Sequence, residues 1–429
     1  MIIYLIAITV FMVQCFIMFY IYITQQKRFK QNMQHPFEPQ QDLNQFFYFM
    51  LLPCLNEGKV IKNSLSYLNN LQGRKHIIVI DDDSDDDTIT QAQSVDGPIS
   101  IVQRKLPNAR TGKGDALNSA IPTIQKIIKE QNLDPKYCII GVLDADGVLS
   151  ANSIVKLNQS FRDEETDAVQ LRIKMKSPGK ILQTFQDIEF FVINHLIQLV
   201  RTHLKAVALC GNGQFFRAST VLNKLGDQPW GNALLEDYEL TLRMELNGLT
   251  IRYVDEAYVE QEALKKVKKL VRQRARWSQG GFNCWKYLKH VSKSKTVSLG
   301  QKIDAYFFFI QPVLNILADF SIIFLTINFI LRYVQNPEFI FIVFIIMTVL
   351  SFFFGTVFTI IYQKELKLHD KYHLVIQKDD MINEKFKFRR GILSIGLLSY
   401  IYVIFFFSLI IACYHLLAGH TVWDKTQRN

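Results

Sequence analysis

The stretch Tyr137-Cys138-Ile139-Ile140-Gly141-Val142-Leu143-Asp144-Ala145-Asp146 passes from an apolar run of strand length directly into two carboxylates. Two similar apolar runs, at 46–52 and 76–80, come before it, and residues 57–71 and 116–129 have the apolar spacing of helices. Strands that alternate with helices predict a mainly parallel sheet with helices on both faces. Because ligands bind such sheets at the carboxyl ends of the strands, the acidic end of this stretch is a candidate site.

The two carboxylates, Asp144 and Asp146, stand at alternate positions after the apolar run. Such a pair can share one divalent ion that bridges a donor diphosphate. The ion would neutralise the charge of a departing nucleotide and act as a Lewis acid. A D-x-D triplet often occurs by chance, but its place at the end of a predicted strand favours the metal site.

A second acidic run, from Asp81 to Asp87, follows the apolar segment 76–80. A carboxylate at that point can accept hydrogen bonds from a nucleobase or a ribose. An EF-hand calcium loop would need Gly at the sixth position and Glu at the twelfth, where Asp86 and Ala92 stand. A solvated acidic turn that caps the next helix is the other interpretation.

A lysine flanked by glycines, Gly112-Lys113-Gly114, precedes the helical segment 116–129. A P-loop needs Ser or Thr after this lysine and another Gly six positions before it, and the chain has Gly114 and Pro107 there. The sequence therefore excludes a P-loop ATPase. Lys113 at a helix start can still meet a diphosphate, and an ordinary helix N-terminus is the alternative.

Two motifs further along the chain each allow two interpretations. Glu236 and Asp237 precede a helical run, so they are either helix caps and dipole partners or, for Asp237, a general base that deprotonates an acceptor hydroxyl. Gln273, Arg276 and Trp277 offer an amide, a fork for phosphate oxygens and a flat apolar face. Arg and Trp near a membrane are also common interfacial anchors.

The composition indicates a catalytic domain joined to a membrane part, since 49% of the 429 residues are hydrophobic. The excess lies in four stretches of about 20 or more apolar residues, the length that crosses a bilayer. Lys27, Arg28 and Lys30 follow the first stretch, so the positive-inside rule places the catalytic region in the cytoplasm. The net charge of +10 is explained by basic segments near anionic headgroups and needs no nucleic acid.

We therefore expect a multi-pass protein of the cell membrane. Its predicted segments are a transmembrane helix at 1–24, a linker at 25–46, the catalytic domain at 47–262, amphipathic interfacial helices with the Gln273 motif at 263–303, transmembrane helices at 304–331 and 339–362, a cytoplasmic basic loop at 363–390, a transmembrane helix at 391–418 and a tail at 419–429. Within the catalytic domain, residues 181–201 predict one long amphipathic helix.

Taken together, the motifs resemble the processive, membrane-embedded members of family 2 glycosyltransferases, which make cellulose, hyaluronan, chitin and poly-N-acetylglucosamine. The resemblance spans about residues 47–290 and rests on seven elements in the family's order: 53–57, Asp81-Asp82, Gly112-Lys113, Asp144-x-Asp146, 211–217, Glu236-Asp237 and Gln273-x-x-Arg276-Trp277. Asp83 stands where the family usually has Gly, and Asp tolerates a left-handed backbone.

The resemblance implies a GT-A fold, an α/β domain with a mostly parallel sheet, and a role for each motif. These roles are uridine binding by Asp81 and Asp82, diphosphate binding by Lys113, Asp144, Gln273 and Arg276, binding of Mg²⁺ or Mn²⁺ by Asp146 with Asp144, base catalysis by Asp237 beside Glu236, and acceptor binding by Trp277, Gly211 and Gly213. Direct attack by the acceptor hydroxyl would invert the anomeric centre.

The resemblance further implies transfer from a UDP-sugar to the growing end of a β-linked polysaccharide at the cytoplasmic membrane face, coupled to export of the polymer. Transfer of one sugar to a membrane lipid is the alternative. Four transmembrane helices are fewer than some relatives use for a polymer channel, so a small accessory subunit or a homo-oligomer is a further expected partner.

Overall fold

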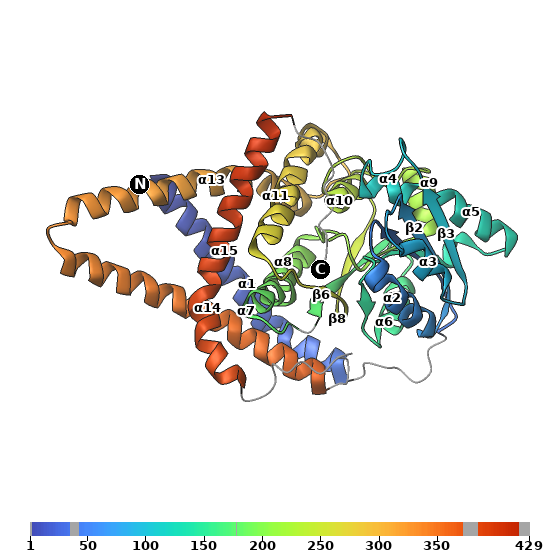
Figure 1. The fold of residues 1–429 in the computed structure, drawn as a ribbon, viewed down its shortest axis with the longest axis horizontal. Helices are drawn as coiled ribbons and strands as arrows, with labels where there is room; N and C mark the ends of the chain where they lie inside the picture. The colour runs from blue at the N-terminus through green and yellow to red at the C-terminus, as the bar shows by residue number, and fades with distance from the viewer. Residues whose placement is uncertain (1, 35–42, 177, 372–384, 420–429) are drawn as a thin grey trace.

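The computed structural model describes residues 2–34, 43–176, 178–371 and 385–419, and it places an α/β domain beside a group of long helices (Figure 1). The described strands form one sheet of order β3-β2-β1-β4-β7-β6-β8-β5. Their bounds are β1 Phe47–Cys54, β2 Arg74–Asp82, β3 Ile99–Arg104, β4 Cys138–Val142, β5 Val148–Leu149, β6 Ala168–Lys176, β7 Gln214–Arg217 and β8 Ile251–Glu262.

The sheet is mixed. Strands β3, β2, β1 and β4 are parallel neighbours, and β6 is parallel to β8. Strand β7 runs antiparallel to both β4 and β6, and β5 runs antiparallel to β8. The predicted mostly parallel α/β fold is therefore confirmed, with two antiparallel strands that the sequence pattern did not reveal.

Helices cover both faces of the sheet, and four longer helices lie outside the α/β domain. The helices of the domain are α2 Gly58–Asn70, α3 Thr88–Gln93, α4 Lys113–Asn118, α5 Ile121–Glu130, α6 Ser153–Phe161, α7 Ile181–Asp187, α8 His195–Leu204, α9 Ala218–Leu225, α10 Glu236–Leu246, α11 Val267–Asn283 and α12 Leu288–Lys293, with 3₁₀ turns η1 Pro135–Tyr137 and η3 Cys284–Tyr287 and a π-helix η2 Ile188–Asn194. The long helices are α1 Ile2–Gln34, α13 Leu299–Tyr333, α14 Pro337–Lys371 and α15 Lys385–Leu417.

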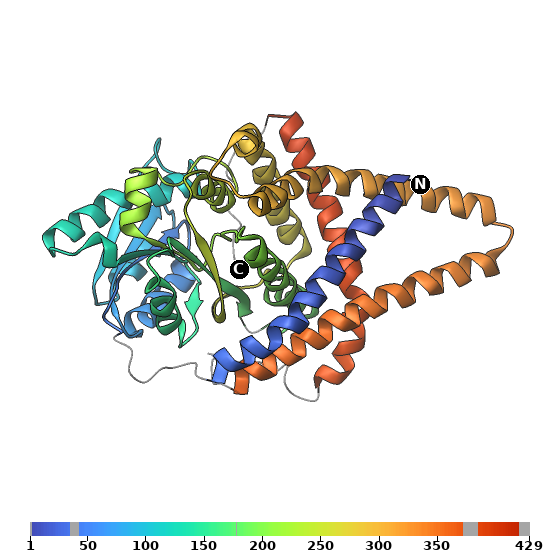
Figure 2. The same cartoon turned by 180° about the vertical axis from the view of Figure 1, so that it is seen from behind.

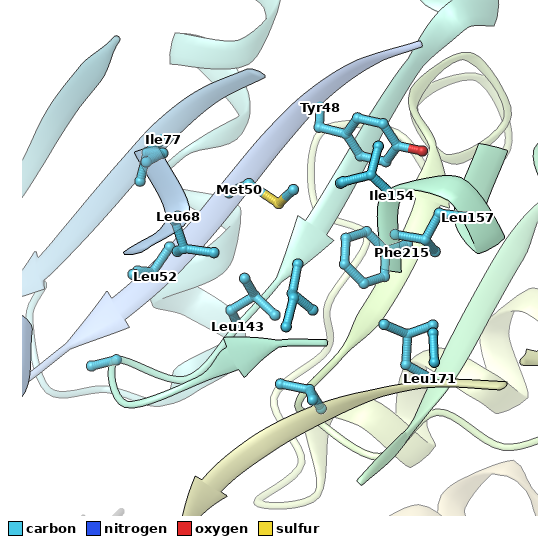
Figure 3. Close-up of a cluster of buried hydrophobic side chains, with 14 of the residues drawn as sticks. Tyr48, Met50, Leu52, Leu68, Ile77, Leu143, Ile154, Leu157, Leu171 and Phe215 are labelled. Atoms are coloured by element: carbon cyan, nitrogen blue, oxygen red, sulfur yellow. The ribbon is translucent and has the colours of Figure 1, made fainter. Parts of the chain in front are cut away.

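Strand β1 is the centre of the core because both of its faces are covered. Side chains alternate between the two faces of a strand, so Tyr48, Met50 and Leu52 enter one apolar cluster, while Phe47, Phe49 and Leu51 enter another. Figure 3 shows the first cluster, in which Phe215 and Leu171 of the antiparallel part join the β1 side chains. One continuous core thus holds the parallel and antiparallel parts of the sheet together.

Four described helices are long and apolar enough to cross a membrane: α1, α13, α14 and α15. Helices α13 and α14 form a hairpin that extends away from the α/β domain, and α1 and α15 cross it near the domain (Figures 1 and 2). Helix α1 ends at Gln34 and α14 at Lys371, so helix replaces the start of the predicted linker and of the predicted basic loop. The rest of those predictions at 35–42 and 372–384, and the tail from 420, lie outside the described residues.

The predicted helix at 181–201 is interrupted. Its path is α7, then the π-helix η2, then α8, which ends at Leu204. A π-helical turn inserts extra backbone into a helix, shifts the side chains that follow around the axis, and is frequent near functional sites.

Asp83 has a φ of 67°, so the expected left-handed backbone at this position is confirmed.

Candidate active site

A cleft opens where the carboxyl ends of β1, β2 and β4 face the N-terminus of α10 and one side of α11. It gathers the following predicted site residues from six separate segments: Asp82, Lys113, Asp144, Gly211, Glu236, Asp237, Gln273, Arg276 and Trp277. The parallel strands position the first carboxylates because their carboxyl ends share one edge of the sheet. The remaining groups reach this edge through the helices packed beside it.

Three predicted site residues, Asp81, Asp146 and Gly213, do not line this cleft. Gly213 has a φ of 70°, and a Cβ atom there would lie 2.6 Å from Cγ1 of Val259. Glycine is therefore required at 213 by the close approach of β8 and by the left-handed backbone. Its neighbour Gly211, with a φ of 73°, does line the cleft and faces Asp237.

Lys113 is the charge centre of the cleft. Its Nζ atom lies 2.9 Å from Oδ1 of Asp144 and 3.5 Å from Oε1 of Glu236, and it donates to the carbonyl oxygen of Gly211 at 3.0 Å. Burial disfavours the charged lysine, but Asp144 and Glu236 outweigh this effect and raise the pKa of Lys113 to about 12. Asp144 and Glu236 thus stabilise the charged form of the ammonium group within the cleft.

Asp237 has the properties of a general base. Burial in the cleft and the adjacent charge of Glu236 raise the pKa of Asp237 to about 7, although Lys113 opposes the shift. A base with a pKa near the working pH combines a populated carboxylate with a strong tendency to take a proton. Its Oδ1 atom accepts a hydrogen bond from the backbone N–H of Tyr238 at 2.7 Å, which orients the carboxylate at the start of α10.

Helix α10, which carries Asp237, is also held by the first turns of α13. The ring of Tyr238, next to Asp237, stacks on Phe308 of α13 with centroids 3.7 Å apart. Arg201 of α8 lies 5.9 Å from the Tyr238 ring centroid and pairs with Asp304 of α13 at 2.9 Å. The first turns of α13 therefore form one wall around the start of α10.

The two aspartates that end β2 differ in their surroundings. Asp82 lines the cleft and pairs with Arg104 of β3 at 2.5 Å, and burial raises its pKa above the ordinary value. Asp81 is fully buried: its Oδ2 atom accepts from the backbone N–H of Ser84 at 3.3 Å, whereas its Oδ1 atom has no hydrogen-bond partner among the described residues. A buried carboxylate oxygen without a donor is suited to an N–H or O–H group of a ligand.

The D-x-D residues offer carboxylate oxygens to a divalent ion, and a donor diphosphate would complete the site. The part of the chain that the structure describes holds no group of three or more His, Cys, Asp or Glu side chains that could bind a metal. Asp144 faces the cleft, and Asp146 is 3% exposed, with its Oδ2 atom accepting from the backbone N–H of Glu262 at 2.6 Å. One or two carboxylates completed by phosphate oxygens and water are a normal Mg²⁺ site, so these oxygen ligands fit Mg²⁺ or Mn²⁺.

Helix α11 presents the Gln273 motif to the cleft. Residues 273, 276 and 277 share one side of a helix because they are three and four positions apart, and all three line the cleft. The ring of Trp277 meets Phe190 edge to face, with centroids 6.0 Å apart. Arg274 points elsewhere: its guanidinium lies 4.1 Å from the Trp277 ring centroid and pairs with Glu189 at 3.0 Å.

Sequence reasoning missed three residues at this site. Arg104 neutralises Asp82, the Oδ1 atom of Asn212 accepts from the backbone N–H of Asp144 at 3.2 Å, and Phe190 lines the cleft beside Trp277. Asn212 lies between Gly211 and Gly213 in the 211–217 motif, so the motif itself pointed to this residue. Arg104 and Phe190 come from segments whose pairing with the site depends on the tertiary fold.

Comparison with known proteins identifies the family and the fold. Residues 45–280, more than half of the chain, match the family described as "Glycosyltransferase like family 2". The solved structure of the mannosyltransferase PcManGT from Pyrobaculum calidifontis, in complex with GDP-Man and Mn²⁺, superposes with a TM-score of 0.54 at 14% identity over 97% of this chain and 99% of that one. This second likeness shows the fold.

Three curated relatives cover about half of the chain. A probable glycosyltransferase YdaM of Bacillus subtilis is 30% identical over 61% of this chain and 61% of its own length. The poly-β-1,6-N-acetyl-D-glucosamine synthase of Staphylococcus aureus is 28% identical over 54% and 53%. The β-monoglucosyldiacylglycerol synthase of Trichormus variabilis is 28% identical over 55% and 49%. The chain thus matches about half to three fifths of the length of these relatives.

The fold and the cleft define a glycosyltransferase with a GT-A domain. The chain belongs to glycosyltransferase family 2, and the expected fold and enzyme class are both confirmed.

Proposed function

We propose that the chain moves a sugar from a UDP-sugar to the growing end of a β-linked polysaccharide, with inversion, at the cytoplasmic membrane face. The observation that carries this proposal is that Asp237, with a pKa of about 7, and Trp277 line the same cleft as Lys113 and Asp144. A base, a stacking surface for a sugar and a diphosphate-binding pair within one cleft suit transfer from a nucleotide-sugar to a saccharide hydroxyl.

The donor would lie along the carboxyl ends of β1, β2 and β4. The uridine would hydrogen-bond to Asp82, which lines the cleft. The Oδ1 atom of Asp81 has no partner among the described residues, but Asp81 is fully buried and would have to be uncovered to bind the uridine as well. Lys113, with Gln273 and Arg276 from the opposite side, would bind the diphosphate through charge-assisted hydrogen bonds. When bound by Asp146, with Asp144, Mg²⁺ or Mn²⁺ supplies positive charge that neutralises the leaving nucleotide.

The transfer itself would need one proton acceptor. Asp237 takes the proton of the acceptor hydroxyl while that oxygen forms a bond to the anomeric carbon and the bond from this carbon to the diphosphate breaks. Attack opposite the leaving group converts an α-linked donor into a β-linked product. Glu236 tunes Asp237, because its negative charge helps to raise the pKa of Asp237 towards neutrality.

The acceptor would enter past Trp277 and Phe190. The flat indole face supports a pyranose ring, and Gly211 leaves room beside Asp237, where a Cβ atom would come within 3.0 Å of Oδ2. We propose that successive sugars pass over this face, so that synthesis is processive and is coupled to export along α1, α13, α14 and α15. A small accessory subunit or a second copy of the chain would complete that path.

A single-sugar transfer to a membrane lipid is the second candidate. It is favoured by the β-monoglucosyldiacylglycerol synthase relative, which matches this chain at the same 28% identity as the polysaccharide synthase. Four helices long and apolar enough to cross a membrane would suit a lipid acceptor as well as a polymer.

A donor screen with purified full-length protein in lipid nanodiscs tests the proposal. UDP release is measured for UDP-glucose, UDP-N-acetylglucosamine and their relatives with Mg²⁺ or Mn²⁺, and the products from radiolabelled donor are sized. We expect a long polymer from one donor. A lipid that carries one sugar would establish the second candidate, and the absence of UDP release with every donor would refute both.

A further inference from the structure

The side of α11 that faces away from the cleft holds a buried ion pair. Arg274, whose side chain is 2% exposed, places Nη2 3.0 Å from Oε2 of Glu189 and donates from Nη1 to Oε1 of Gln273 at 2.9 Å. The same guanidinium lies 4.1 Å from the ring centroid of Trp277. Arg274 therefore touches two of the residues that line the cleft without lining it.

Glu189 connects this pair to a membrane helix. Its Oε2 atom also accepts a hydrogen bond from the hydroxyl of Tyr400, on α15, at 2.7 Å. The ring of Tyr400 stacks on Phe185 of α7 with centroids 5.0 Å apart. One carboxylate oxygen thus joins α15, the π-helix and α11.

Two neighbouring residues of the π-helix, Glu189 and Phe190, act on the face and on the edge of the Trp277 ring. Glu189 pairs with the arginine that lies over the indole, and the next residue, Phe190, meets the indole edge to face at 6.0 Å. The indole is therefore enclosed by a cation on its face and by an aromatic ring at its edge. Both contacts depend on the path of η2.

We propose that Glu189 is a positioning residue that fixes Trp277 for the acceptor and, through Tyr400, links the acceptor subsite to helix α15. This inference rests on the proposed function in one respect: Trp277 is taken to bind the acceptor. A shift of α15 would move the carboxylate of Glu189, then Arg274, and then the indole. The donor side should change less than the acceptor side, because Asp82 and Lys113 have their own ionic partners in the domain, although Arg274 also donates to Gln273, which is assigned to the diphosphate.

The mildest test removes one hydroxyl. Tyr400→Phe retains the ring that stacks on Phe185 and deletes only the hydrogen bond to Glu189. The matched control is Tyr402→Phe, two residues further on α15, whose ring stacks on Phe406 at 6.0 Å. In full-length protein in nanodiscs, we expect Tyr400→Phe to raise the KM for the acceptor about fivefold, with the Kd for UDP within about twofold of the wild type, while the control matches the wild type.

A stronger variant and a double mutant test the chain of contacts. Glu189→Gln removes the charge that holds Arg274, and we expect an acceptor KM at least tenfold above that of the wild type, with the Kd for UDP raised by no more than about twofold through Gln273. Because Tyr400 and Arg274 act through the same oxygen atom, the Tyr400→Phe and Glu189→Gln double variant should be no worse than Glu189→Gln alone. Additive losses would contradict a shared path.

A spectroscopic readout keeps the inference separate from the proposed function. The chain has four tryptophans, and a Glu189→Gln variant should change the emission of Trp277 because the guanidinium over its ring loses its partner. This difference should disappear in a Trp277→Phe background. If the wild type transfers no sugar, the proposed function fails, but the fluorescence result still decides whether Glu189 positions Trp277.

The inference is overturned if Tyr400→Phe matches Tyr402→Phe in acceptor KM and Glu189→Gln leaves the Trp277 emission unchanged. If Glu189→Gln fails to fold, the comparison of the two tyrosine variants decides the question. If the Kd for UDP rises as much as the acceptor KM in both Tyr400→Phe and Glu189→Gln, the contacts support the whole fold and the positioning role is rejected.

Discussion

The Nζ atom of Lys113 lies 2.9 Å from Oδ1 of Asp144, so a cation of the protein itself already neutralises the D-x-D carboxylate at the edge of the cleft. A metal bound with the donor diphosphate would share Asp144 with this lysine. Lys113 therefore has two opposed effects: it competes with the metal in the donor-free protein and attracts the diphosphate when the donor arrives.

This competition predicts the effect of removing the lysine. In Lys113→Ala, donor-free protein should bind Mn²⁺ about tenfold more tightly, because Asp144 and Glu236 lose the cation that competes with the metal. The variant should bind UDP about tenfold more weakly, because a charge-assisted hydrogen bond to the diphosphate is lost. Titration of Mn²⁺ by electron paramagnetic resonance and of UDP by calorimetry measures both. Lys126→Ala, an exposed lysine of α5, is the control; weaker Mn²⁺ binding in Lys113→Ala would contradict the competition.

Asp237→Asn tests the catalytic base. The amide preserves shape and removes the proton acceptor, so turnover should fall at least a hundredfold, the lower range for loss of a general base. The Kd for UDP should change little, since Asp237 takes no part in donor binding. Asp227→Asn, at an exposed loop position that accepts from Gln125, is the matched control. Unchanged turnover in Asp237→Asn would remove it as the base.

The pH dependence follows from the same residue. Only the carboxylate form of Asp237 accepts a proton, and its pKa is about 7, so kcat/KM should fall about tenfold per pH unit below that value and level off above it. Glu236→Gln removes a negative charge that raises the pKa of Asp237. The acidic limb of the profile should therefore move to lower pH in this variant, and a wild-type limb near pH 4 would refute the assignment.

Two adjacent glycines of α11 provide a stability test. A Cβ atom at Gly280 would lie 2.4 Å from the backbone N of Leu235, whereas one at Gly281 has its nearest contact at 3.4 Å from Phe308. Gly280→Ala should push α11 away from the segment before Asp237 and cost about 1–3 kcal/mol, as overpacking does. Gly281→Ala should be neutral or stabilising by up to about 1 kcal/mol through helix propensity. Thermal unfolding followed by circular dichroism compares them.

The parallel part of the fold could be predicted from the sequence. The runs at 46–52, 76–80 and the one that starts at Tyr137 correspond to β1, β2 and β4. They are continuous apolar strands buried on both faces, which makes them visible without any partner. The helix at 57–71 is α2, but the helix at 116–129 is two, α4 and α5, because the chain turns between Asn118 and Ile121.

The rest depends on distant partners. Strand β7 has only four residues, Gln214–Arg217, and its antiparallel direction is set by pairing with β4 and β6. Arg274 was placed within a motif, but nothing local reveals that it faces Glu189, 85 residues earlier. The site residues at strand ends could thus be predicted from the sequence. The residues that hold them in place, such as Glu189, could not, because their contacts arise from packing between separate elements.

The stacking of Tyr238 on Phe308 has a consequence for biogenesis. The catalytic motifs are complete in the nascent chain once residue 277 has been made, yet the wall beside the base is supplied by α13, which begins at Leu299. The wall beside Asp237 is therefore in place only after Phe308 has left the ribosome and α13 has docked. A chain still being synthesised can carry every motif of the enzyme before it has this wall.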